Sequence, residues 1–181
     1  MYEVEIKVPA TLESVRYRLI ALDATPTGEV RQADTYYDAP HRSFPETDEA
    51  LRIRRESTRT ETAEKTVITY KGPLVDDDSK TRTEVETAVE DADDFAAILT
   101  NLGFEPAAIV RKERERFELE SYTITLDRVE GVGEFVEVET EVDTEAAIES
   151  ARKGAFDTLE KLGLDPADQI RTSYLGLLLE E

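Results

Sequence analysis

Near its N-terminus the chain reads Glu3-Val4-Glu5-Ile6-Lys7-Val8, in which charged and apolar side chains alternate. Successive side chains of a β-strand point to opposite faces of a sheet, so the three charges share one face and the three aliphatic residues share the other. A single strand of this kind is typical of a sheet with one face in water. The alternation would indicate a charged face that is shared by several strands only if other strands repeat it.

The same alternation recurs, with charges of both signs, in most of the later β-prone segments. The repeated charged positions are Arg52 and Arg54, Arg82, Glu84 and Glu86, Lys112 and Arg114, and Glu137 and Glu139. If these faces converge inside a closed barrel, they form a lumen lined with cations and carboxylates. The alternative is that the charges face solvent or pair with one another, as most strand charges do. Repetition in several strands favours the barrel.

The order of elements predicts an α+β chain with eight strands and amphipathic helices between them. Apolar periodicity predicts one helix capped by Thr11, a second from the cap Asp91 to Leu102, and a third over residues 144–162. Residues 173–178 read as a short helix or strand. No Gly, Ser or Pro linker divides the chain, so we expect a single domain over 1–181. The expected strands are 2–8, 34–38, 50–55, 66–72, 81–89, 108–119, 122–129 and 133–142.

Composition restricts both the partners and the metals that the chain can bind. There is no cysteine and only one histidine, His41, so a metal would be held mainly by oxygen ligands, which suit hard cations such as Mg²⁺, Mn²⁺ or Ca²⁺. The net charge of −20 disfavours nucleic acid as a partner. No apolar run approaches the roughly 20 residues that span a membrane, and the early first strand leaves no room for a signal peptide. We therefore expect a cytoplasmic protein without a membrane partner.

The acidic residues are also unusual in their number and spread. Asp and Glu total 42 against 22 Lys and Arg, and they are distributed along the whole chain rather than gathered in a tail. This pattern favours a halophilic protein, in which high salt screens the self-repulsion. The alternative is an ordinary acidic protein.

Two sets of lumen candidates carry the chemistry. Arginine forks and lysine point charges suit phosphate oxygens, and carboxylates left over after charge neutralisation would hold hard cations. The basic set is Lys7, Arg52, Arg54, Lys71, Arg82, Lys112 and Arg114. The acidic set is Glu3, Glu5, Glu84, Glu86, Asp127, Glu137 and Glu139.

These residues stand in motifs that resemble the CYTH superfamily, the triphosphate tunnel metalloenzymes. The N-terminal Glu3-x-Glu5-x-Lys7 alone would be weak evidence, but further motifs follow in family order over nearly the whole chain. They are Asp34-Thr35-Tyr36-Tyr37-Asp38, Glu49-Ala50-Leu51-Arg52-Ile53-Arg54-Arg55, Tyr70-Lys71-Gly72-Pro73, Arg82-x-Glu84-x-Glu86, Lys112-x-Arg114 and Leu126-Asp127-x-Val129-x-Gly131-x-Gly133-x-Phe135-x-Glu137-x-Glu139.

The resemblance implies an eight-stranded antiparallel tunnel, with helices packed outside it, that binds a triphosphate together with Mg²⁺ or Mn²⁺. By position, the implied triphosphate ligands are Arg52, Arg54, Lys71, Arg82, Lys112 and Arg114. The implied metal ligands are Glu3, Glu5, Glu137 and Glu139, with Glu84 and Glu86 as further lumen acids. Lys7 and Asp127 are the implied catalytic residues. Lys7 would contact phosphate or help to activate water, and Asp127 would position metal or water.

Within the superfamily the motifs are most similar to the class IV adenylate cyclases and their archaeal relatives. This likeness implies that ATP is converted to cyclic AMP and pyrophosphate. Hydrolysis of inorganic triphosphate, thiamine triphosphate or a nucleoside triphosphate remains the alternative, and a polyphosphate-binding module is the alternative without catalysis. His41 and Arg42 lie in an expected loop, where they would contact a base or simply face solvent. The oligomeric state is open, with a homodimer as one possibility.

Overall fold

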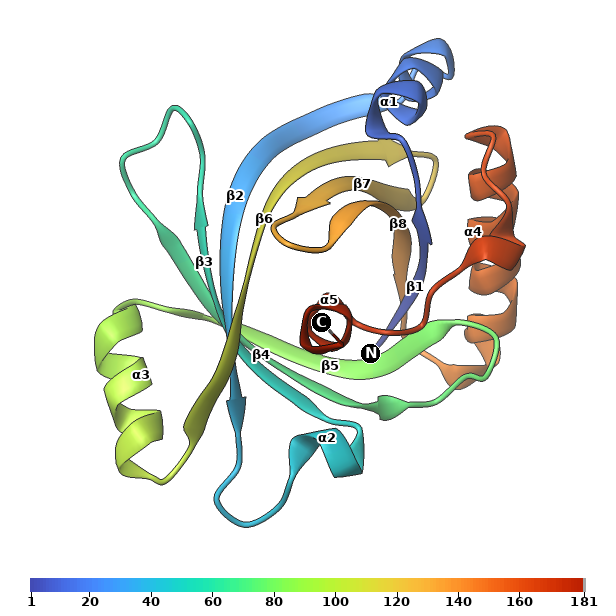
Figure 1. The fold of residues 1–181 in the computed structure, drawn as a ribbon. Helices are drawn as coiled ribbons and strands as arrows, with labels where there is room; N and C mark the ends of the chain where they lie inside the picture. Colours follow the sequence, from blue (N-terminus) through green and yellow to red (C-terminus); the bar gives the residue numbers. More distant parts are fainter. Residues whose placement is uncertain (181) are drawn as a thin grey trace.

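The computed structural model describes residues 1–180, and its strands close into a single barrel (Figure 1). The strand order around the barrel is β1-β5-β4-β3-β2-β6-β7-β8, and each neighbouring pair is antiparallel. The predicted eight-stranded antiparallel barrel is therefore confirmed. The strands are β1 (Tyr2–Pro9), β2 (Thr25–Asp38), β3 (Ala50–Ser57), β4 (Lys65–Leu74), β5 (Lys80–Val89), β6 (Glu105–Leu119), β7 (Tyr122–Val129) and β8 (Gly133–Val142).

Helices cover the outside of the barrel on two sides, as predicted for this α+β fold. α1 and α4 pack on β1, β7 and β8, and α3 packs on β3 and β6. The C-terminal helix α5 is seen within the ring of strands in Figure 1 and contacts β6. The helices are α1 (Leu12–Ala21), α2 (Phe44–Thr47), α3 (Ala92–Asn101), α4 (Ile148–Lys161) and α5 (Tyr174–Leu179), with 3-10 turns at Glu145–Ala147 and Pro166–Asp168.

The apolar residues of the alternating strands form the core between the barrel and its helices. Ile6, Val136 and Val138 are fully buried in one cluster with residues of α1 and α4. On the other side of the barrel, Leu51 and Ile53 pack with residues of α3. Each fully buried aliphatic side chain contributes about 1.5–3 kcal/mol. The side chains on the outer face of each strand therefore stabilise the barrel, and the side chains on the inner face are free to line the lumen.

A close contact fixes α4 against the barrel. The hydroxyl of Tyr122, at the start of β7, donates to the backbone carbonyl of Ala151 at 2.8 Å. A Cβ atom on Gly154 would lie 2.0 Å from that hydroxyl oxygen. Only glycine leaves room there, because real Cβ contacts are never so short.

Strand β2 differs most from its prediction. It begins at Thr25 rather than at 34, and residues 25–33 are mostly exposed. This extension pairs with β6 through an irregularity between Pro26 and Gly28. The polar sequence with Pro and Gly carries no local strand signal, and pairing with β6 makes it a strand.

Three local details also differ from the predictions. β4 continues through Gly72-Pro73 to Leu74, and a register shift accommodates the proline, which cannot donate to the ladder. Thr11 makes no side-chain cap, and Glu134 accepts from the backbone N–H of Leu12 instead, at 3.2 Å. The expected loop before β3 contains the short helix α2. The predicted cap Asp91 is confirmed, since it accepts from the N–H of Asp94.

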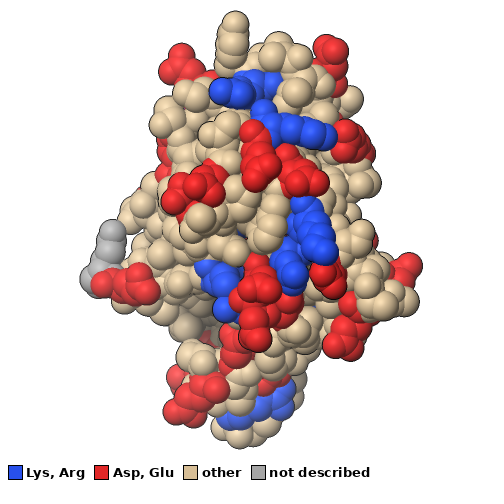
Figure 2. Space-filling view, turned by 90° about the vertical axis from the view of Figure 1, so that its right-hand side faces the viewer, with Lys and Arg blue, Asp and Glu red and all other residues tan. Residues whose placement is uncertain are grey.

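The outer surface reflects the composition. Figure 2 shows acidic side chains scattered over one face, with fewer Lys and Arg side chains among them. None of the helices in residues 1–180 is long and apolar enough to cross a membrane.

Candidate functional site

The barrel encloses a cavity of about 460 Å³. Strand parity predicts that the charged faces meet in a common lumen, and the structure places them there. The lining includes every residue predicted to hold metal or triphosphate and both further acids: Glu3, Glu5, Glu137, Glu139, Arg52, Arg54, Lys71, Arg82, Lys112, Arg114, Glu84 and Glu86. The two residues predicted to be catalytic, Lys7 and Asp127, are fully buried and do not line the open space.

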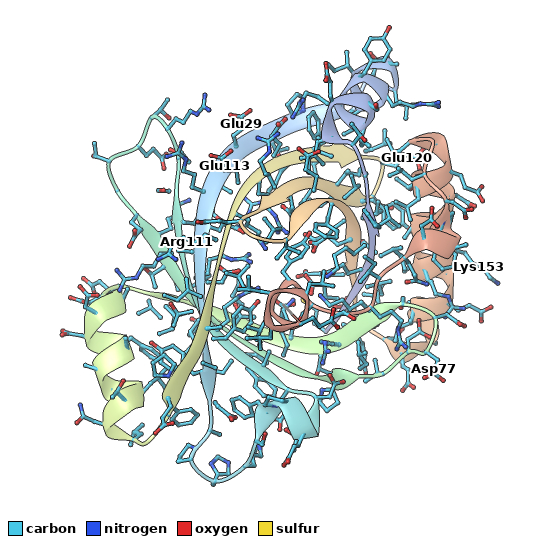
Figure 3. All side chains as sticks on the ribbon, viewed as in Figure 1. Glu29, Asp77, Arg111, Glu113, Glu120 and Lys153 are labelled. Atoms are coloured by element: carbon cyan, nitrogen blue, oxygen red, sulfur yellow. The ribbon has the colours of Figure 1, made fainter. Side chains whose placement is uncertain are left out.

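Strand β6 shows how parity separates structural charges from lumen charges. Arg111 and Glu113 are exposed on the outside of the barrel, as Figure 3 shows. Lys112 and Arg114, each one residue further on, are buried and line the cavity. The sequence RKER therefore contributes alternate charges to two different environments.

Three carboxylates converge on the cavity from neighbouring strands. Glu3, Glu5 and Glu139 each offer an oxygen atom, and these oxygens lie within 4.8 Å of one another. The cluster forms because β1 pairs with β8 so that Glu5 lies directly opposite Glu139. Burial, followed by the negative charge of Glu3, raises the pKa of Glu139 to about 8. The burial and the neighbouring carboxylates therefore disfavour the charged form of Glu139.

The donor set fits a hard divalent cation. Three carboxylate oxygens from three residues match the ligand type and part of the ligand number of Mg²⁺ or Mn²⁺. The fourth predicted ligand, Glu137, lies outside this cluster and accepts a hydrogen bond from Arg114 at 2.8 Å. The structure thus brings together three of the four predicted metal ligands.

A lysine pair lies beside the carboxylate cluster. Lys71 contacts Glu3 at 2.7 Å and Glu84 at 3.2 Å, and Lys80 donates to Glu5 at 3.0 Å. Burial, followed by the hydrogen bond with Glu3, raises the pKa of Glu84 to about 7. Two of the three cluster carboxylates, Glu3 and Glu5, therefore each have a lysine as an ion-pair partner.

A second network surrounds Asp34 on β2, which is fully buried. Its two oxygens accept hydrogen bonds from the Nε and Nη2 atoms of Arg54, both at 2.8 Å. One oxygen also lies 3.9 Å from Arg52 and 3.8 Å from Lys112. Burial opposes the negative charge, but Arg54 and the other two cations outweigh it and hold the pKa of Asp34 well below its usual value. Asp34 is the internal anion that keeps three lumen cations together.

Lys7 and Asp127 lie beneath Tyr174 of α5. The Tyr174 hydroxyl donates to Asp127 at 2.7 Å, and its ring centroid is 4.3 Å from the ammonium nitrogen of Lys7 and 4.8 Å from that of Lys112. Among the described residues, the Lys7 nitrogen has no hydrogen-bond partner. Burial, followed by the charge of Lys80, lowers the pKa of Lys7 to about 7. Asp127 also accepts two hydrogen bonds from Arg114, both at 2.6 Å.

Arg82 lies at the margin of the cavity with its guanidinium already bonded. It donates to the backbone carbonyls of Asp48 and Gly72, both at 2.7 Å, and to the Asp48 side chain at 2.9 Å. Arg82 thus braces the loop before β3 against the irregular end of β4. His41 and Arg42 are exposed, bonded to each other and, through Arg42, to Glu49, and neither lines the cavity.

Three residues of this site were not among those predicted from the sequence. Lys80 continues the alternation of Arg82 and Glu84 by one more step, so parity alone could have included it. Asp34 belongs to a quoted motif, but nothing local assigns it to the lumen. Tyr174 belongs to the site only because the C-terminal segment places α5 within the ring of strands, and no local sequence signal predicts that placement.

Comparisons with known proteins agree with this geometry. Residues 1–174 match the CYTH domain. The protein belongs to the CYTH family. A Methanocaldococcus jannaschii protein named as a candidate adenylate cyclase is 36% identical over 178 residues, which is 98% of each chain. The adenylate cyclase CyaB of Aeromonas hydrophila is 30% identical over 147 residues, covering 81% of this chain and 72% of that one.

A solved structure from Pyrococcus horikoshii is similar over almost the whole chain. It superposes with a TM-score of 0.91 at 38% identity, and 98% of each chain is covered. Enzymes of the CYTH family act on triphosphate substrates and depend on metal ions, and they include adenylate cyclases and triphosphatases.

Proposed function

We propose that this CYTH protein is a metal-dependent enzyme that converts ATP to cyclic AMP and pyrophosphate. The observation that carries the proposal is the carboxylate cluster of Glu3, Glu5 and Glu139, which lies inside the same cavity as the lumen cations. The similarity to relatives named as adenylate cyclases supports this choice of reaction.

The lumen cations would bind and orient the triphosphate. Arg52, Arg54, Lys71, Lys112 and Arg114 line the cavity from several strands, so they can contact phosphate oxygens from different sides. Their internal partners hold them in place before substrate arrives. This preorganisation lets them stabilise charge that develops on the leaving pyrophosphate.

Glu3, Glu5 and Glu139 would hold Mg²⁺ or Mn²⁺. When bound, such a cation offsets charge on phosphate oxygens and lowers the pKa of the attacking hydroxyl. In the reaction the 3′-oxygen of ATP would form a bond to the α-phosphorus, the bond from that phosphorus to the pyrophosphate oxygen would break, and the hydroxyl proton would pass to solvent water. Asp127 would fix Arg114 through its two hydrogen bonds, and Lys7 would add positive charge behind them.

Two other functions use the same residues. In a triphosphatase, water attacks the terminal phosphorus of tripolyphosphate, thiamine triphosphate or a nucleoside triphosphate, and no 3′-hydroxyl is needed. A polyphosphate-binding module would need no reaction at all. The carboxylate cluster argues against the binding module, because without metal it repels an anion.

The products separate these three functions. The protein is incubated with ATP, tripolyphosphate or thiamine triphosphate in the presence of Mg²⁺ or Mn²⁺. Cyclic AMP with pyrophosphate supports the cyclase. Inorganic phosphate released with ADP, with pyrophosphate or with thiamine diphosphate, according to the substrate, supports the triphosphatase. Metal-independent binding without turnover of any substrate would leave only the binding module.

Glu5→Gln tests the carboxylate cluster directly. It keeps the shape of the side chain but removes one charge, so turnover should fall by orders of magnitude, since metal activation contributes several kcal/mol. Binding of tripolyphosphate without metal should persist or tighten. The matched control is Glu13→Gln on the exposed face of α1, which should behave as the wild type. Normal turnover by Glu5→Gln would show that the N-terminal motif is not part of the active site.

A further inference from the structure

A threonine hydroxyl links two charged side chains of the lumen. In the strand register, Thr69 on β4 lies directly opposite Arg52 of β3 and directly opposite Glu86 of β5. Side chains of directly opposite residues lie on the same face of a sheet. Since Arg52 and Glu86 line the cavity, the side chain of Thr69 also points toward the lumen.

The Thr69 hydroxyl is hydrogen-bonded on both sides. Its oxygen accepts from Nη2 of Arg52 at 3.2 Å, and its proton is donated to a carboxylate oxygen of Glu86 at 2.7 Å. The direction of both bonds is fixed, because a guanidinium has only donors and a carboxylate has only acceptors. Thr69 is 1% exposed and does not line the cavity. It can therefore act on a ligand only through its two partners.

Arg52 is the buried lumen arginine that the protein itself holds least firmly. The side chains of Arg54 and Arg114 donate two and three hydrogen bonds to buried carboxylates. Within residues 1–180, the Arg52 side chain donates only the bond to Thr69, and its contacts with carboxylate oxygens are no shorter than 3.8 Å. Its Nε atom is buried and has no hydrogen-bond partner in that part of the chain. A buried N–H without a partner is unfavourable, so Arg52 has an unused donor that an anion in the cavity can satisfy.

A triphosphate is the anion that the proposed function brings into this cavity, and guanidinium groups bind phosphate oxygens through several N–H groups at once. We infer that Thr69 is a positioning residue, whose hydroxyl holds Arg52 so that the remaining donors of its guanidinium meet the phosphate oxygens. The inference rests on the triphosphate binding of the proposed function, and it adds a residue that makes no contact with the substrate. Glu86 has a role in it as the acceptor that orients the hydroxyl.

The physical effect of the hydroxyl is preorganisation. Arginine has a long side chain, and holding it in the binding conformation before the ligand arrives lowers the entropy lost on binding. Without the hydroxyl, Arg52 loses its only side-chain hydrogen bond within the described residues, while the Glu86 carboxylate lies 3.8 Å from Nη2. The guanidinium would then turn toward Glu86, and fewer of its donors would face the phosphate.

Calorimetry on the full chain tests this role, with tripolyphosphate as the ligand and EDTA present. Thr69→Val keeps the shape of the side chain but removes the hydroxyl, and Thr69→Ser keeps the hydroxyl. The matched control is Thr125→Val on β7, where the threonine is 0% exposed and its hydroxyl has no hydrogen-bond partner within residues 1–180. Thr69→Val should raise the dissociation constant about threefold to tenfold. Thr69→Ser and Thr125→Val should each change it by less than about twofold.

A double-mutant cycle separates positioning from a general structural role. In an Arg52→Met protein the guanidinium is absent, so a residue that acts through Arg52 has nothing left to position. Adding Thr69→Val to Arg52→Met should therefore change the dissociation constant of tripolyphosphate by less than about twofold. A loosened barrel would instead weaken binding by the same factor with Arg52 and without it.

The outcomes distinguish this role from the proposed function. The positioning role is refuted, and the proposed function stands, if the wild type binds tripolyphosphate but Thr69→Val binds it equally well. An equal loss in Thr69→Ser, or an equal loss in the Arg52→Met background, also refutes it. If the wild type does not bind tripolyphosphate with or without Mg²⁺, both fail. If Thr69→Val does not fold, as judged from its melting curve, Thr69→Ala takes its place with the same expected results.

Discussion

Replacing Asp34 with asparagine tests the internal anion of the lumen. The variant keeps the shape of the side chain but leaves Arg52, Arg54 and Lys112 near one another with no carboxylate between them. Since Arg54 and its neighbours hold the pKa of Asp34 well below its usual value, the wild-type carboxylate is fully ionised at pH 7. The substitution therefore removes a complete negative charge from a site with no exposed surface.

The size of the effect follows from the burial of the network. Removing one partner of a buried ion pair costs about 3–5 kcal/mol, because the remaining charges stay buried without compensation. In a protein of this length each kcal/mol lowers the melting temperature by about 2–4 °C, so the expected loss is roughly 6–20 °C. A bound triphosphate should restore part of it, since phosphate oxygens can replace the carboxylate as the partner of the three cations.

The assay is thermal unfolding monitored in a scanning calorimeter. EDTA is present throughout, and each protein is measured in the absence and in the presence of saturating tripolyphosphate. The matched control is Asp77→Asn in the exposed turn between β4 and β5, which should melt as the wild type does. Without ligand, the melting temperature of Asp34→Asn should lie well below that of the wild type. With saturating tripolyphosphate, the difference in melting temperature between the two proteins should be smaller. The role of Asp34 as internal anion would be refuted if, without ligand, the substitution lowered the free energy of unfolding by less than about 1 kcal/mol. It would also be refuted if tripolyphosphate left the difference in melting temperature unchanged.

Three further predictions follow from the charges. If the net charge of −20 is an adaptation to salt, the melting temperature should rise between low and molar KCl, and a flat or falling curve would contradict this. Lys71→Ala should weaken metal-free binding of tripolyphosphate, measured by calorimetry, more than Lys153→Ala on the exposed face of α4 does. The pKa of Lys7 is lowered to about 7, so its charged form destabilises the fold fully below that pH, and the penalty fades as pH rises toward the unfolded value near 10.5. Urea unfolding of wild type and Lys7→Met should therefore show a stability difference that shifts in favour of the wild type between pH 7 and 10, and a constant difference would be evidence against the lowered pKa.

The sequence was sufficient to predict which strand faces form the lumen. Parity depends only on the two-residue period of a strand, so Glu3, Glu5, Arg52 and Arg54 could be assigned to one side without knowing their partners. The same argument extends to Lys80, although the predicted strand began one residue too late to include it.

The first half of β2 could not be predicted in this way. Residues 25–33 are polar, mostly exposed and interrupted by Pro26 and Gly28, and their extended conformation depends on pairing with β6, more than 75 residues away in the chain. Propensity is a weak guide when a tertiary partner decides the conformation. Asp34 could not be assigned to the lumen from the sequence for the same reason. Its position between the cations depends on the register of β2 against β3 and β6.

Parity also gives the direction of a side chain but not what covers it. Lys7 lies on the lumen face of β1, as the alternation predicts, yet the open cavity does not reach it. Tyr174 fills that part of the lumen, and it comes from a helix 167 residues later in the sequence. The burial of Lys7, its lowered pKa and its missing hydrogen-bond partner all follow from a contact between the two ends of the chain. A residue's chemistry in this barrel therefore depends on two separate facts, the strand face that carries it and the depth to which α5 closes the lumen above it.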